Sequence, residues 1–223
     1  MTIQGNTQQW HDLLDSFVPD IVNLILAAWE SMPPIANDSK EDPVSIELCK
    51  KLRTAKTLAD LPLQVHTQTV ELDSQAENVE QGRIDITFHP MVPSEAIYFA
   101  LECKRVNVMQ ANGKVRRYFA EYVTEGLTRF VSGQYSHSVR QGGMIAFVLD
   151  GDVPSAINGV LRNIVDKRIL IRLIDESVKP SRFLPANESM RETTHSRDTN
   201  AGDVLIQHFF LCVNPADLAA SGT

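Results

Sequence analysis

The segment from Ile97 to Lys104 constrains the fold more than any other part of this 223-residue chain. It reads Ile-Tyr-Phe-Ala-Leu-Glu-Cys-Lys, a nearly continuous apolar run that ends in two opposite charges. Such a run is typical of a strand in the interior of a sheet. Because side chains alternate between the faces of a strand, Glu102 and Lys104 share one face, where a buried charge needs a partner or a function.

A second strand is expected just before it, at Arg83 to Phe88, and carries Asp85 within an apolar run. Strand alternation places this aspartate on the face opposite to Ile84, Ile86 and Phe88. Neighbouring strands would bring Asp85 close to Glu102, and two carboxylates repel one another unless a cation neutralises them. Oxygen ligands of this kind suit Mg2+ or Mn2+. A structural Glu/Lys pair at a strand end is the simpler alternative for the tripeptide Glu-Cys-Lys alone.

The rest of the chain alternates helical and strand patterns, which predicts an α/β fold. We expect helices at 8–30, 40–54, 114–130 and 152–168, and strands at 64–72, 83–88, 96–105, 144–149, 169–174 and 204–213. Residues 73–81 are expected to form a turn or loop, so the first three strands make an antiparallel meander. The short apolar strand at 144–149 suits a parallel neighbour covered by helices. The sheet is therefore mixed and flanked by helices.

Length and composition favour one domain over 1–223 with a well-buried core, since 43% of the residues are hydrophobic. Its expected parts are an N-terminal helical extension at 1–38, a core at 39–150, a long polar loop at 175–203 and a final strand at 204–213. The net charge of -7 argues against a generally basic nucleic-acid binder. Three scattered cysteines, the lack of a secretory signal and the lack of an apolar stretch long enough to span a bilayer favour a cytoplasmic protein.

These residues resemble the PD-(D/E)XK nuclease superfamily, which has a restriction-endonuclease-like core, over roughly residues 39–150. The resemblance implies a metal held by Asp85, Glu102 and the backbone carbonyl of Cys103, with Lys104 beside the attacking water. Ile84 stands where many members have proline. Members often add an acid from the first core helix, and Glu41 lies in line with the apolar stripe of that helix. A favourable carboxylate at a helix N-terminus explains Glu41 equally well.

Nucleic-acid contacts are expected along an acid-free stretch between Glu102 and Glu121. Its cations are Lys104, Arg105, Lys114, Arg116 and Arg117, which would meet a phosphate backbone beside the metal site. The resemblance adds Arg129, Gln134 and Tyr135 from the helix that follows and the residues just beyond it. A solvated helix start, a structural salt bridge of Arg129 and ordinary packing of Tyr135 are the alternatives.

The expected function is that of a Mg2+-dependent (or Mn2+-dependent) endonuclease that acts on DNA in preference to RNA, in bacterial defence or DNA processing. The resemblance implies products with a 5'-phosphate and a 3'-hydroxyl. No separate DNA-reading domain is visible, so loops, a homodimer or a protein partner would supply specificity. The alternatives are a catalytically silent module of the same fold, acting in nucleic-acid binding or protein assembly, and an unrelated α/β protein in which the motif is coincidental.

Overall fold

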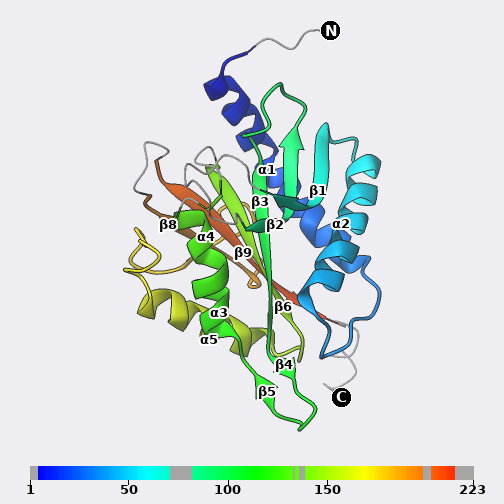
Figure 1. The fold of residues 1–223 in the computed structure, drawn as a ribbon, viewed down its shortest axis with the longest axis vertical. Helices are drawn as coiled ribbons and strands as arrows, with labels where there is room; N and C mark the ends of the chain where they lie inside the picture. Colours follow the sequence, from blue (N-terminus) through cyan, green and yellow to red (C-terminus); the bar gives the residue numbers. More distant parts are fainter. Residues whose placement is uncertain (1–4, 71–81, 133, 136–138, 198–201, 214–223) are drawn as a thin grey trace.

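A computed structural model describes residues 5–70, 82–132, 134–135, 139–197 and 202–213 of the protein. A seven-stranded sheet runs through this part of the chain in the order β1-β2-β3-β6-β9-β8-β7, with helices on both faces (Figure 1). The strands of this sheet are β1 (Leu63–Val70), β2 (Arg83–Pro90), β3 (Phe99–Val106), β6 (Gln141–Val148), β7 (Lys179–Pro180), β8 (Met190–His195) and β9 (Val204–Cys212). A separate two-stranded ribbon pairs β4 (Val108–Met109) with β5 (Val115–Arg116).

The helices are α1 (Thr7–Glu30), α2 (Glu41–Leu58), α3 (Phe119–Glu121), α4 (Thr128–Val131) and α5 (Val153–Asp166), with a π-helical segment, η1 (Tyr122–Leu127), joining α3 to α4. Pro19 lies inside α1. A proline in the middle of a helix can kink or divide it, and this one leaves α1 undivided. None of the helices in the described ranges is both long enough and apolar enough to cross a membrane.

The predicted α/β fold with a mixed sheet is confirmed. Strands β1, β2 and β3 pair antiparallel in sequence, as the meander requires, and β6 lies parallel to β3. The last strand, β9, is also parallel to β6, with Met144 opposite His208. Strand β3 therefore has an antiparallel neighbour on one side and a parallel neighbour on the other, which gives it the interior position that its apolar sequence indicates.

Each face of the sheet has its own apolar core. Helices α1 and α2 cover the face that carries Leu101 and Cys103, whereas η1, α4 and α5 cover the face that carries Ala100, Met144 and Ala146. The alternation along β3 follows the sequence prediction, because Ala100 and Lys104 belong to the face under η1. Lys104 thus emerges between η1 and the start of α2.

Strand alternation in β2 is less regular than the sequence suggests. Ile86 and Phe88 pack in the core under α1 and α2, as expected, but Ile84 packs in the opposite core. The expectation for Ile84 was therefore wrong. Gln68, between the two β1 residues that pair with Ile84 and Ile86, has a left-handed backbone with φ 53°. This left-handed residue interrupts the regular pleat of β1 opposite Asp85, at the point where β2 changes face.

Three predicted elements differ in the structure. The helix expected from residue 114 begins at Phe119, because Val115 and Arg116 pair with β4 instead. The strand expected at 169–174 is a series of turns with one isolated bridge, Leu173 to His195. The polar segment 175–203, expected to be a loop, contains β7 and β8, and β8 pairs along its length with β9. The predicted loop at 73–81, the end of the first strand and residues 198–201 lie outside the described residues.

Candidate metal and phosphate site

The candidate site forms where β2 separates from β3. Pairing of these strands runs from Phe88 with Phe99 to Ile86 with Leu101 and stops before Asp85. The next two amide groups on this edge of β3 are instead bound by side chains: Cys103 N donates to Asp85 Oδ2 at 2.7 Å, and Arg105 N donates to Glu41 Oε2 at 3.1 Å. Carboxylates therefore replace a neighbouring strand at the position where the motif lies.

Glu102 lies at the centre of the site and is completely buried. Its Oε1 atom is 2.8 Å from Lys104 Nζ and 2.8 Å from Arg129 Nη1, and its Oε2 atom accepts a short hydrogen bond from the Tyr135 hydroxyl. Burial, followed by the Glu102 charge, raises the pKa of Tyr135 well above its ordinary value, so the phenol remains a donor. The structure therefore gathers Arg129 and Tyr135, both expected at the nucleic acid, around the buried glutamate.

Lys104 lies between two carboxylates that come from distant parts of the chain. Its Nζ atom is 2.9 Å from Glu41 Oε1, on the first turn of α2, and 2.8 Å from Glu102 Oε1. Burial acts to lower the pKa of Lys104, but the two carboxylates outweigh it and raise that pKa above its ordinary value. The side chain is therefore an ammonium at neutral pH. Glu41 reaches the site as predicted, with the lysine between it and Glu102.

Asp85 is a buried carboxyl group with only 7% of its surface exposed. Burial, followed by the negative charge of Glu102, raises its pKa to about 7, against the stabilising hydrogen bond from the Cys103 amide. A positive charge between Asp85 and Glu102 would remove this penalty. The sequence prediction that Asp85 and Glu102 act on one another electrostatically is thus reproduced in the folded chain.

The residues present fit a divalent cation in two respects. Glu102 Oε1 is buried and, although two cationic nitrogens lie nearby, accepts no well-directed hydrogen bond. The amide and the carbonyl of a strand residue point to the same neighbouring strand. Because the Cys103 amide donates to Asp85, the Cys103 carbonyl lies on the same edge of β3 as that carboxylate. Within the described ranges, no three histidine, cysteine, aspartate or glutamate side chains form a metal-binding group. Further ligands would have to be backbone, water or phosphate oxygens.

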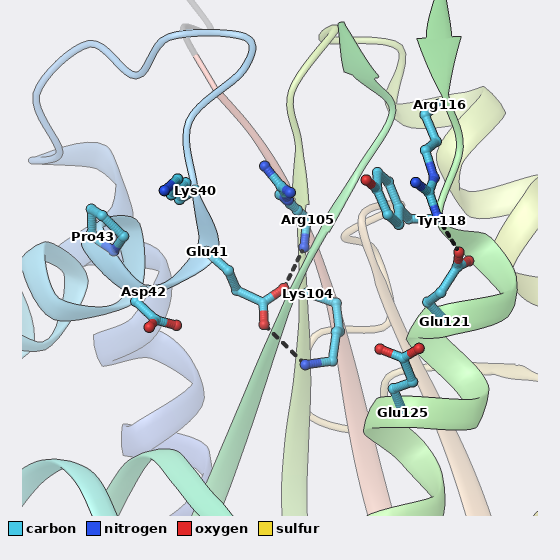
Figure 2. A pocket seen from close by; sticks show the side chains of 10 residues that line it. All are labelled: Lys40, Glu41, Asp42, Pro43, Lys104, Arg105, Arg116, Tyr118, Glu121 and Glu125. Carbon is cyan, nitrogen blue, oxygen red and sulfur yellow. Dashed lines mark hydrogen bonds and ion pairs between the residues drawn. The ribbon is translucent and has the colours of Figure 1, made fainter. Parts of the chain in front are cut away.

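A groove of about 720 Å³ opens next to Lys104. Figure 2 shows the first turn of α2 on one side of it, β3 in the middle, and α3 with η1 on the other side. The charges of its lining balance. The four cations are Lys40, Lys104, Arg105 and Arg116, and the four acids are Glu41, Asp42, Glu121 and Glu125. The acid-free stretch of the sequence therefore does not make a uniformly basic surface, because α2, α3 and η1 bring acids to it.

Tyr118 contributes an aromatic ring to the lining of this groove. The Arg116 guanidinium lies 4.2 Å from the centre of its ring, and that of Arg105 lies 5.5 Å away. Tyr118 also has a left-handed backbone with φ 56°, a costly conformation for a bulky residue. This turn directs the chain from β5 into α3 and keeps both arginines at the groove.

The remaining predicted contact residues are more dispersed. Lys114 is exposed in the β4–β5 ribbon, and Arg117 points away from the groove, donating to Asn107 Oδ1 at 3.4 Å and Ser155 Oγ at 3.2 Å. Gln134 packs against Gly82, where an added Cβ would meet its Nε2 atom at 1.9 Å. Tyr135 is 1% exposed, so we assign it to holding Glu102 and not to contacting nucleic acid.

Six groove residues were absent from the sequence prediction of the site: Lys40, Asp42, Pro43, Tyr118, Glu121 and Glu125. Their only sequence signal was proximity to Glu41 or to the basic stretch, because the groove is formed by segments far apart in the chain. Comparisons with protein-family models, with curated proteins and with solved structures find no match for this chain.

Proposed function

We propose that the protein is a metal-dependent nuclease with a restriction-endonuclease-like core, which hydrolyses DNA phosphodiester bonds. One observation carries the proposal: where β2 separates from β3, Asp85 accepts from the Cys103 amide next to the buried Glu102, whose charge raises the pKa of Asp85, and the Lys104 ammonium lies between Glu102 and Glu41. A structural pair of Glu102 and Lys104 at a strand end would not require a second buried acid. Asp85 is such an acid, and the Glu102 charge raises its pKa. The cluster is therefore better explained as a binding site.

Asp85, Glu102 and the Cys103 carbonyl would hold Mg2+ or Mn2+, and Glu41 would hold Lys104 from the other side. When bound, the cation would lower the pKa of a water molecule and stabilise negative charge on the phosphate. Because Lys104 is kept protonated by its two carboxylates, it would orient the water and stabilise developing charge rather than accept a proton. Arg129 and Tyr135 would hold Glu102 in place from the interior.

The groove beside Lys104 is where the substrate would lie. Arg105 and Arg116 are placed to contact phosphates, and Tyr118 holds both guanidinium groups. The balanced charge of the lining would give weak binding by this groove alone. A second copy of the chain or a protein partner would then contribute to affinity and specificity.

The direct test is incubation of the protein with supercoiled and linear DNA in Mg2+ or Mn2+, with EDTA as the reference. We expect metal-dependent cleavage that falls by at least about 100-fold in Lys104→Met, a typical loss for a group that stabilises transition-state charge. The matched control is Lys50→Met, because Lys50 is an exposed lysine that also pairs with a glutamate, Glu47. Cleavage that survives in Lys104→Met would overturn the proposal.

Thermal unfolding with and without Mn2+ separates the nuclease from a catalytically silent module of the same fold. Metal-dependent stabilisation that is lost in Asp85→Asn, without cleavage of any DNA, would indicate a site that binds metal but requires a partner or an activator. If neither cleavage nor metal-dependent stabilisation occurs, the motif is structural and the proposal fails.

A further inference from the structure

A chain of buried polar side chains lies on the other side of η1 from the groove. Tyr122 Oη is 3.0 Å from His208 Nδ1, and His208 Nε2 is 2.7 Å from Thr193 Oγ1. Thr193 Oγ1 is also 2.7 Å from His195 Nε2, and His195 Nδ1 is 2.7 Å from the carbonyl oxygen of Ile171. All four side chains are completely buried. The chain links η1 to β9, β8 and the turns after α5.

The partners permit one arrangement of protons. The Ile171 carbonyl only accepts, so His195 carries its hydrogen on Nδ1 and its Nε2 atom accepts from the Thr193 hydroxyl. Thr193 has then used its only hydrogen and must accept from His208 Nε2. The free Nδ1 atom of His208 accepts from Tyr122, which would otherwise donate only to the more distant Met144 carbonyl at 3.3 Å.

Both histidines are neutral in this arrangement. Burial lowers the pKa of His195 to about 4, against a smaller upward influence of the hydrogen bond to the Ile171 carbonyl. Burial and, to a smaller extent, the neighbouring His195 lower the pKa of His208 to about 3. Every donor has an acceptor, and all four hydrogen bonds run in the same direction. A fully satisfied buried network of this kind fixes the position of the group at its end, which here is the Tyr122 hydroxyl.

Tyr122 is the first residue of the π-helical segment, and Gly126 of the same segment packs on the candidate site. A Cβ added at Gly126 would lie 2.5 Å from Met144 Cε and 3.4 Å from Lys104 Cγ. The absence of a side chain at Gly126 thus allows η1 to pack closely on the sheet, with the lysine stem among the groups beside it. Segments of π-helix are rare and occur often at functional sites.

We propose that Tyr122 is a positioning residue: the hydrogen-bond chain through His208, Thr193 and His195 holds η1 on β3, so that Gly126 confines the Lys104 side chain between Glu41 and Glu102. The inference deepens the proposed nuclease function and rests on it for its catalytic consequence. The conformational part does not depend on activity.

The proton arrangement can be measured on the unmodified protein by long-range 1H–15N NMR of the histidine rings. We expect His208 to carry its hydrogen on Nε2 and His195 to carry its hydrogen on Nδ1, both at neutral pH. The opposite tautomer at either ring would break the chain at Thr193 and overturn the inference.

Amide hydrogen exchange across residues 122–127 then tests the role of the chain. Loss of one hydrogen bond in Tyr122→Phe is expected to speed exchange there by about tenfold. At His208, asparagine keeps an acceptor near Nδ1, whereas glutamine keeps a donor near Nε2. We therefore expect His208→Asn to retain slow exchange and His208→Gln to behave like Tyr122→Phe. A purely structural histidine would give the same exchange in both variants, which would overturn the inference.

DNA cleavage by the same variants distinguishes the two proposals. If Tyr122 positions Lys104, Tyr122→Phe and His208→Gln lower kcat and leave KM unchanged, and His208→Asn restores kcat. If the unmodified protein cleaves no DNA while exchange follows the expected order, the nuclease proposal fails and the positioning of η1 stands. If cleavage occurs but kcat is the same in all three variants, the positioning role fails and the nuclease proposal stands.

Discussion

Cys103 donates its amide hydrogen to the Asp85 carboxylate at 2.7 Å, at the first position where β2 no longer pairs with β3. One aspartate thus ends a ladder of strand hydrogen bonds and approaches the buried Glu102 at the same time. Its two roles, satisfying a backbone donor and contributing an oxygen ligand, can be separated by substitution.

Asp85→Ala leaves the buried Cys103 amide without an acceptor, whereas Asp85→Asn keeps a side-chain oxygen at that place. We expect the alanine variant to be less stable than the asparagine variant by about 1–3 kcal/mol, the cost of an unsatisfied buried donor. Denaturant unfolding in EDTA measures this difference. Addition of Mn2+ should stabilise neither variant. Equal stability of the two would show that the amide finds another partner.

Tyr135 and Glu102 should be energetically coupled. We expect Tyr135→Phe to lower the unfolding free energy by about 1.5–3 kcal/mol, because it removes a hydrogen bond to a buried charge. In a Glu102→Gln background the same substitution should cost clearly less, since the acceptor is then neutral. A double-mutant cycle from denaturant unfolding gives the coupling. Strict additivity would mean that the tyrosine contributes packing alone.

Two adjacent arginines provide a matched pair for the groove. Arg116 lines the groove, whereas Arg117 turns toward Asn107 and Ser155. We expect Arg116→Ala to weaken DNA binding and to reduce the slope of log K against log salt by about 0.9, the value for one phosphate contact. Arg117→Ala should leave both quantities nearly unchanged. Fluorescence anisotropy with labelled DNA in Ca2+ measures them, and the reverse order would place the substrate on another face.

Acid should destabilise the protein through His195. Its pKa is about 4 in the folded chain, below the ordinary 6.5, because of burial. The unfolded chain therefore binds the proton first, so stability is full above about pH 6.5 and falls as the pH drops toward about 4. At 1.36 kcal/mol per pKa unit, this ring accounts for a loss of about 2–3 kcal/mol between about pH 7 and about pH 4.5.

His195→Gln should flatten that part of the stability profile, as measured by denaturant unfolding at a series of pH values. His66 is exposed on β1, so His66→Gln is the control and should retain the slope of the unmodified protein. An unchanged slope in His195→Gln would locate the acid sensitivity in other groups.

The centre of the sheet could be predicted because its sequence signals are local. The apolar runs in β2, β3, β6 and β9 identify buried strands, and alternation along β3 correctly groups Glu102 with Lys104 on the η1 side. Strand β8 escaped prediction because, apart from Met190, its buried side chains are polar. Thr193 and His195 belong to the hydrogen-bond chain, and Glu192 accepts from Arg182 and Gln207. Such partners become visible only in the folded chain.

The opposite error occurred at 169–174, where an apolar run predicted a strand. Ile169, Leu170 and Ile174 are 87%, 55% and 49% exposed in the structure, so their hydrophobicity is not used in the core. At the candidate site, the structure pairs Lys104 with Glu102 and Glu41 and places Asp85 on the Cys103 amide, so the residues that residue type singled out lie in one region. Residue type could not show that Tyr135 turns inward, because that depends on how the chain continues after α4.

The π-helical segment has a consequence for the register of everything that follows it. A π-turn holds one residue more than an α-turn, and one residue corresponds to about 100° of rotation in a helix. If 122–127 wound as an ordinary α-helix with all its residues kept, the extra residue would rotate Arg129 away from Glu102 by about that angle. The pairing of Arg129 with the buried glutamate therefore depends on the π-turn, which takes up one residue between Tyr122 and Arg129.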